Sequence, residues 1–315
     1  MSAILQDPDL VLEEPLPRRG GFLWQVIRER PSAAVGAAGL LLAVLAALLA
    51  PWLAPYGLGQ QVGGVFEPPS SRHWLGLDDG GVDMVSLLLW GLRVSLLAGL
   101  AATLVAMVLG GAVGLAAGYF GGRTESVLMR ATDYFIVVPE VPLMIVVAAI
   151  WGPSLFHIIV VIGVLLWAGT ARIVRAQVKS VRERVYVRRA RALGAGHARI
   201  LLRHVLPQVA PLLVATTVLT VAVAIFDETF LSFLGLGDPG SVSLGKIIES
   251  AFERSAISAG AWWAIVPPGV EVALLVLACS LLGQALEDAL NPRLKVAHLS
   301  VRHFRVLPRR PEAEP

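Results

Sequence analysis

Six long apolar stretches constrain the fold of this 315-residue chain more than any other feature. A helix needs about 20 mostly apolar residues to cross the hydrocarbon core of a bilayer. The sequence therefore predicts an all-α integral membrane protein of about six transmembrane helices. The stretches lie near residues 33–54, 87–118, 128–151, 155–171, 209–233 and 264–286.

The composition agrees with a membrane protein. Hydrophobic residues make up 56% of the chain and charged residues 16%, whereas a soluble domain carries about 25% charge. The net charge of +3 does not indicate nucleic acid binding, because the basic residues cluster beside apolar stretches and so indicate membrane orientation and contact with lipid. The one cysteine, Cys279, excludes an intrachain disulfide and a cysteine-based metal cluster.

Charge in the connecting segments predicts the orientation. Ten Lys or Arg residues lie between Arg172 and His204, against the single acid Glu183, and basic loops stay in the cytoplasm. Residues 55–87 hold one base and four acids, as an outside segment would. Six spans then place both termini in the cytoplasm. The predicted divisions are a cytoplasmic tail 1–31, a transmembrane domain 32–295 with outside segments 55–87 and 234–263 and a cytoplasmic loop 172–208, and a cytoplasmic tail 296–315.

The basic loop has a recognisable helical pattern. Residues 187–193 favour a helix, Gly194 permits a turn, and an apolar face restarts at residues 200–202 before Pro207, which we expect to interrupt it. The pattern predicts two short helices broken at a glycine and projecting from the membrane. On charge alone, the loop would serve only as an orientation signal.

This loop resembles the cytoplasmic "EAA" loop of ABC importer permeases, which docks on the ATPase subunit. Gly194, Leu206 and Pro207 fall on that pattern and favour docking over a mere orientation signal. The family's glutamate and first alanine are replaced by Arg188 and Arg189, and Ala190 is kept. Because the charge is reversed, we expect a compensating acid on a co-adapted ATPase.

Further stretches resemble the permeases of dipeptide, oligopeptide and nickel importers, from about residue 32 to residue 295. That resemblance implies a type I ABC importer permease fold in the plasma membrane of a prokaryote (the inner membrane of a Gram-negative cell). It also implies a homologous second permease, two ATPase subunits that hold ATP and Mg²⁺, and an external solute-binding protein. The chain itself would be no enzyme and hold no cofactor or metal, and its solute stays open between peptide and nickel. The matching stretches are residues 73–83, Glu228 with residues 231–237, and residues 288–293, with Leu77 and Val82 as departures.

Acidic residues within the apolar stretches are candidates for a translocation pathway. A charge in hydrocarbon costs about 2.5–3.5 kcal/mol on insertion scales, so such acids normally face a cavity, a partner or water. Asp133 and Glu140 are seven residues apart, which would place them on one face of the third span, and Asp227 and Glu228 lie in the fifth. Membrane-interface positions for Asp133 and Glu271, and a structural helix contact for Glu228, are the alternatives.

Two rival functions remain open at this point. A proton-coupled carrier could use Asp133, Glu140 and Asp227 as its titrating relay. A membrane anchor could bind anionic lipid or a soluble partner through the basic loop. Acids in several spans argue against an anchor, and the docking loop argues against a carrier.

Two glycine-containing patterns have plainer interpretations. Gly110, Gly114 and Gly118 leave one helix face nearly bare, which predicts close helix packing within the chain rather than a subunit seam. Residues 240–246 resemble a phosphate-binding loop, but Ile247 stands where the Mg²⁺-binding hydroxyl belongs, so we reject an ATP site there.

Overall fold

The structure, a computed structural model, describes residues 22–290. Within that range every regular element is a helix, and extended pairing is limited to two isolated bridges. Five helices are long and apolar enough to cross a membrane, and a bent helix pair makes a possible sixth crossing. The predicted all-α fold of about six transmembrane helices is therefore confirmed. Predictions for residues 1–21 and 291–315, including the tail 296–315 and the motif match at Asn291-Pro292-Arg293, lie outside the described residues.

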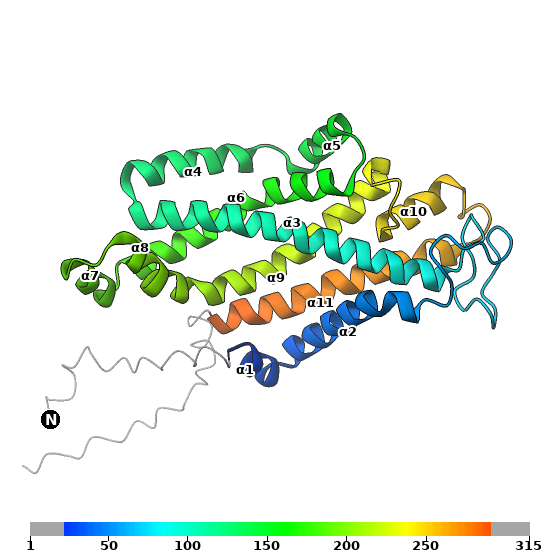
Figure 1. The fold of residues 1–315 in the computed structure, drawn as a ribbon, viewed down its shortest axis with the longest axis horizontal. Helices are drawn as coiled ribbons and strands as arrows, with labels where there is room; N and C mark the ends of the chain where they lie inside the picture. The colour runs from blue at the N-terminus through cyan, green and yellow to red at the C-terminus, as the bar shows by residue number, and fades with distance from the viewer. Residues whose placement is uncertain (1–21, 291–315) are drawn as a thin grey trace, which may run out of the picture.

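The long helices lie side by side and form one elongated bundle (Figure 1). Helix α3 packs most extensively against α6, while α11 packs against both α9 and α2. Helix α3 begins where Asp83 caps it, since the Asp83 side chain accepts a hydrogen bond from the Ser86 backbone N–H. The bundle helices are α2 (Pro31–Leu53), α3 (Met84–Phe120), α6 (Leu155–Arg182), α9 (Leu206–Leu231) and α11 (Val266–Leu290).

The third predicted span is not one straight helix. It consists of α4 (Gly122–Val137) and α5 (Glu140–Trp151), whose axes differ by 85°. The break falls at Val138 and Pro139, both in extended conformation, because proline lacks a backbone N–H and disfavours helical geometry in the residue before it. The prediction that Asp133 and Glu140 share one face of a single helix is therefore wrong.

Pro207 does not interrupt the helical face that restarts at residues 200–202, contrary to the prediction. The short helix α8 (His197–Ile200) continues through a single π-helical segment, η1 (Leu201–Val205), directly into α9. Pro207 lies in the first turn of α9, directly after the π-helical turn. The π-helical segment absorbs the local mismatch, so the chain stays helical from the loop into the membrane.

The predicted connecting segments also contain helices. Helix α1 (Phe22–Glu29) lies in the predicted N-terminal tail, and α10 (Leu244–Glu253) lies in the predicted outside segment. At one extremity of the bundle, the α10 end, the 54–83 segment lies beside α10 (Figure 1). The opposite extremity, the α7 end, holds α7 (Val185–Ala192) and α8.

The glycine face of α3 packs directly on α6. A β-carbon at Gly110 would lie 2.5 Å from the Trp167 carbonyl oxygen, and one at Gly114 would lie 2.7 Å from that of Ala171. Real β-carbon contacts are not this short, so only glycine allows the two backbones to approach so closely. The predicted packing of this face within the chain is confirmed.

The 73–83 motif forms a compact cap at the α10 end. The His73 Nδ1 atom lies 3.0 Å from Asp83 Oδ1, and both side chains are buried. The Asp78 carboxylate accepts hydrogen bonds from the backbone N–H groups of Gly80 and Val82. Burial raises the pKa of Asp78, and these two hydrogen bonds oppose that rise. The motif therefore builds the start of α3.

Candidate functional site

The basic loop folds into a helical projection that we call the knuckle, residues 185–205. Helix α7 ends at Ala192, and Gly194 follows with a φ of 81°. The Gly194 N–H bonds to the Arg191 carbonyl and the Ala195 N–H to the Ala190 carbonyl, which is the hydrogen-bond pattern of a Schellman motif. The predicted pair of short helices broken at a glycine is confirmed.

A small apolar core fixes the knuckle to the bundle. Val187 of α7, Ile200 of α8 and Val205 of η1 are fully buried. They belong to one cluster with Val178 and Val181 from the last turns of α6. Because both arms of the knuckle share this core with α6, they are held as one body against the end of that helix.

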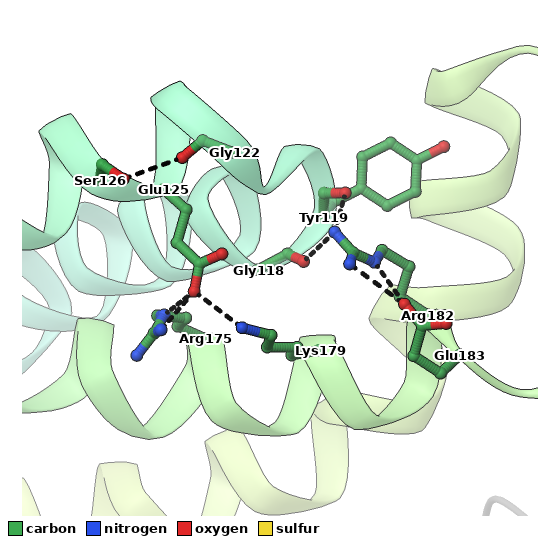
Figure 2. A network of polar contacts seen from close by, with 9 residues as sticks. All are labelled: Gly118, Tyr119, Gly122, Glu125, Ser126, Arg175, Lys179, Arg182 and Glu183. Carbon is green, nitrogen blue, oxygen red and sulfur yellow. Dashed lines mark hydrogen bonds and ion pairs between the residues drawn. The ribbon is translucent and has the colours of Figure 1, made fainter.

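Tyr119, at the end of α3, connects a third helix to the knuckle. Its hydroxyl lies 3.0 Å from His197 Nδ1, and the Arg191 guanidinium lies 5.5 Å from the centre of its ring. The Arg182 guanidinium at the end of α6 donates to the backbone carbonyls of Gly118 and Tyr119 (Figure 2). A displacement of the knuckle would therefore change the contacts of Tyr119 at the end of α3.

An ion cluster joins α4 to α6 beside these contacts. The Glu125 carboxylate accepts from Arg175 Nε at 2.8 Å and from Lys179 Nζ at 3.1 Å (Figure 2). Its side chain is only 16% exposed, so solvent screens these pairs less than ordinary surface pairs. The α7 end of the bundle is thus fastened across α3, α4 and α6.

The predicted docking residues occupy different environments on the knuckle. Arg188 and Arg189 are exposed on α7, and Ala190 is half-buried. Gly194 is exposed at the turn, whereas Leu206 and Pro207 are half-buried in the first turn of α9. The structure therefore brings the two arginines, Ala190 and Gly194 together on α7 and its turn. It places Leu206 and Pro207 where the knuckle enters the bundle.

The sequence interpretation missed Leu193. This side chain is 87% exposed beside Gly194 at the knuckle turn. Leu202 and Val185 on the knuckle are also exposed, at 67% and 57%, so the knuckle offers apolar contact area to a partner beside its basic residues. The available signal was its position, a lone leucine directly before the turn glycine.

Glu228 has a structural environment. It is fully buried on α9, and its two carboxylate oxygens accept hydrogen bonds from Ser95 and Ser232, each at 2.8 Å. The Ser95 hydroxyl in turn accepts from the Leu244 backbone N–H at 3.2 Å. Glu228 therefore connects α9 to α3 and, through Ser95, to the first residue of α10.

Asp133 is held at the surface of the chain. Its carboxylate lies 2.6 Å from Arg172 Nη2, and the two side chains are 54% and 49% exposed. The pair joins α4 to α6. Asp133 thus has a basic partner within the chain, which weakens its assignment to a pathway.

Asp227 and Glu140 remain as a candidate pair. Asp227 is 7% exposed on α9, and its Oδ2 atom has no hydrogen-bond partner in the described part of the chain. Glu140 is exposed at the first position of α5. The break between α4 and α5 thus places Glu140 at the start of a separate helix, which the single-helix prediction did not foresee.

Comparison with known families decides the class of the protein. The model of the family described as binding-protein-dependent transport system inner membrane component matches residues 110–296. The chain belongs to this family. A second model, the N-terminal TM domain of oligopeptide transport permease C, matches residues 22–69 of the permease.

The permease is also similar to individual curated proteins over most of its length. It is 37% identical over 305 residues to the di/tripeptide transport system permease protein of Pseudomonas aeruginosa, covering 94% of this chain and 98% of that relative. It is 35% identical to the dipeptide transport system permease protein of Bacillus subtilis, covering 86% and 85%. The oligopeptide transport system permease protein of Mycobacterium tuberculosis is 35% identical, with 90% and 98% covered.

Proposed function

We propose that this permease forms half of the translocation pathway of an ATP-driven importer for di- or oligopeptides. A homologous second permease would supply the other half, and two ATPase subunits would bind ATP and Mg²⁺. An external solute-binding protein would deliver the peptide. The family membership supports the importer, and the peptide permeases among the relatives favour a peptide over nickel or a metal complex.

The knuckle is the observation that carries the proposal. It is a preformed helical projection with a rigid connection to α3 and α6, and it presents exposed Arg188, Arg189 and Leu193. A rigid projection loses little conformational entropy when it docks on another subunit. Its basic surface would suit an acidic partner surface, so the ATPase would carry compensating acids there.

The charges and chain ends at the α7 end of the bundle support a proposed orientation in the membrane. The α7 end carries most of the basic residues of segment 172–204 and would face the cytoplasm. The two ends of the described chain meet through an ion pair between Arg30 and Asp288, 2.9 Å apart. They lie toward the α7 end (Figure 1), which supports cytoplasmic termini in a prokaryotic plasma membrane, with the α10 end outside.

The candidate pathway acids support a substrate with a positive end. Asp227 and Glu140 would present negative charge toward a cavity shared with the second permease, where a peptide amino terminus could be stabilised. A proton-coupled carrier is less favoured, because Arg172 engages Asp133. The relay proposed for such a carrier would lose one of its three members.

Replacing Leu193 with aspartate tests the docking role. We expect Leu193→Asp to reduce the ATPase recovered with the affinity-purified permease by about tenfold or more, as loss of an apolar contact at an interface centre does. The matched control is Ile257→Asp, because Ile257 is 68% exposed near the α10 end. This control should retain the ATPase fully.

Two results would contradict the proposal. Equal ATPase recovery for Leu193→Asp and the native permease would remove the knuckle turn from the docking surface. A native permease that binds no ATPase from its own cells, and whose peptide uptake stops when the proton gradient is collapsed, would favour the carrier.

A further inference from the structure

A groove separates part of α2 from α11 and reaches α3. It has a volume of about 400 Å³, and its walls are almost wholly apolar. Leu42 on α2 and Leu274 on α11 line it and are 67% and 58% exposed, so the groove opens on the apolar surface of the bundle. On a helix bundle that spans a membrane, such a surface faces lipid or another membrane chain.

The groove runs along the helices rather than across them. A β-carbon at Gly36 would contact the Ala278 carbonyl and the Leu282 backbone N, which shows the close approach of α2 to α11 at one extremity. The lining extends along α11 from Glu271 to Leu281. Ten helical residues span about 15 Å, a length suited to an extended acyl chain.

Glu271 is the one polar side chain among the described residues that line the groove. Its Oε2 atom is buried and has no hydrogen-bond partner within residues 22–290. Because this oxygen is buried, the Glu271 carboxyl group must turn toward the groove to meet a donor on an occupant, and that contact would satisfy an otherwise unpartnered acceptor. Glu271 lies five residues after Val266, the start of α11, or about 7 Å of helix from that end.

We propose that this groove binds one phospholipid whose head group carries a primary ammonium, such as phosphatidylethanolamine. The ammonium donates to Glu271 near the α10 end, and one acyl chain lies along the groove toward Leu281. Charge complementarity selects the head group, while the apolar walls accept any chain. The site is separate from the Asp227 and Glu140 pair and does not depend on the transported solute.

The test compares two lipids that differ at the donor. The purified permease complex is equilibrated in bilayers containing equal amounts of phosphatidylethanolamine and phosphatidylcholine with the same acyl chains, then examined by native mass spectrometry. Because the choline nitrogen carries methyl groups in place of N–H donors, we expect about tenfold preferential retention of phosphatidylethanolamine, as one charge-assisted hydrogen bond would give.

Two substitutions locate the preference. Glu271→Leu should abolish the selection between the lipids while a chain is still retained, and Glu271→Gln, which keeps one acceptor, should reduce it several-fold. Glu253→Leu is the matched control, because Glu253 is an exposed acid at the end of α10. That control should leave the preference unchanged.

The comparison on the native chain decides the proposal even if a variant fails to fold. Equal retention of the two lipids would mean binding by apolar contact only and would overturn the proposed selection. Retention of neither lipid would overturn the lipid site. A disulfide between Leu277→Cys and a cysteine placed on the second permease would then show that a protein chain covers the groove.

Discussion

Replacing the three glycines of the α3 face by alanine will prevent the permease from folding stably. At Gly114 the added β-carbon would lie 2.7 Å from the Ala171 carbonyl oxygen and 2.7 Å from Val174 Cβ. Those atoms belong to a packed helix, which cannot move away without separating α3 from α6. Each overpacked position costs about 1–3 kcal/mol, so the Gly110→Ala, Gly114→Ala, Gly118→Ala triple variant should lose most of its folded protein.

Gly111 provides the matched control on the same helix. A β-carbon there would meet no atom within 4 Å, and alanine is favoured over glycine in a helix by about 1 kcal/mol. Gly111→Ala should therefore keep or slightly raise Tm, whereas the Gly114→Ala single variant should lower it. Thermal unfolding in mild detergent measures both, and an unchanged Tm for the triple variant would contradict the close α3 and α6 packing.

These glycines illustrate which features the sequence could predict. Spacing along one helix fixes which residues share a face, so a bare stripe can be read directly from the sequence. The turn at Gly194 was equally local, because only its own φ of 81° and the hydrogen bonds next to it require glycine. The long apolar stretches likewise identified five membrane helices through their length and composition, whereas the third stretch is a bent pair of helices.

Features that depend on residues distant in the sequence could not be predicted from the sequence. Proline was visible at position 139, but the direction and the 85° size of the bend come from the packing of α5 against the rest of the bundle. At Pro207 the local pattern predicted a break that does not occur, because the π-helical turn η1 lets the helix continue past the proline. The contact of Asp133 with Arg172 spans 39 positions in the sequence, and no local pattern announces it.

The intramembrane acids show the same division within the candidate site. The sequence marked four acids as pathway candidates, because a charge in an apolar stretch requires some partner, and it left a structural contact open for Glu228 and an interface position open for Asp133. Only the fold distinguishes them. Glu228 has serine partners, Asp133 has an arginine partner, and Asp227 has a buried carboxylate oxygen without a partner within residues 22–290.

Removing the Glu228 carboxylate will destabilise the contact between α9, α3 and α10. In Glu228→Ala the buried hydroxyls of Ser95 and Ser232 would lose their acceptors. Each unsatisfied buried group costs about 1–3 kcal/mol, and the vacated volume adds a cavity cost of similar size. We expect a strongly lowered Tm and faster proteolysis of residues 237–262, because Ser95 also accepts the Leu244 N–H at the start of α10.

The Glu228→Gln variant separates a structural role from a pathway role. Glutamine keeps the side-chain volume and one oxygen acceptor, but its NH₂ group cannot accept the second hydroxyl. Ser95 or Ser232 must then rotate, so a structural role predicts an intermediate Tm with uptake falling in proportion to the folded fraction. If uptake by the reconstituted importer disappears while Tm stays at the native value, the negative charge of Glu228 itself serves transport, and the serine contacts position a pathway acid.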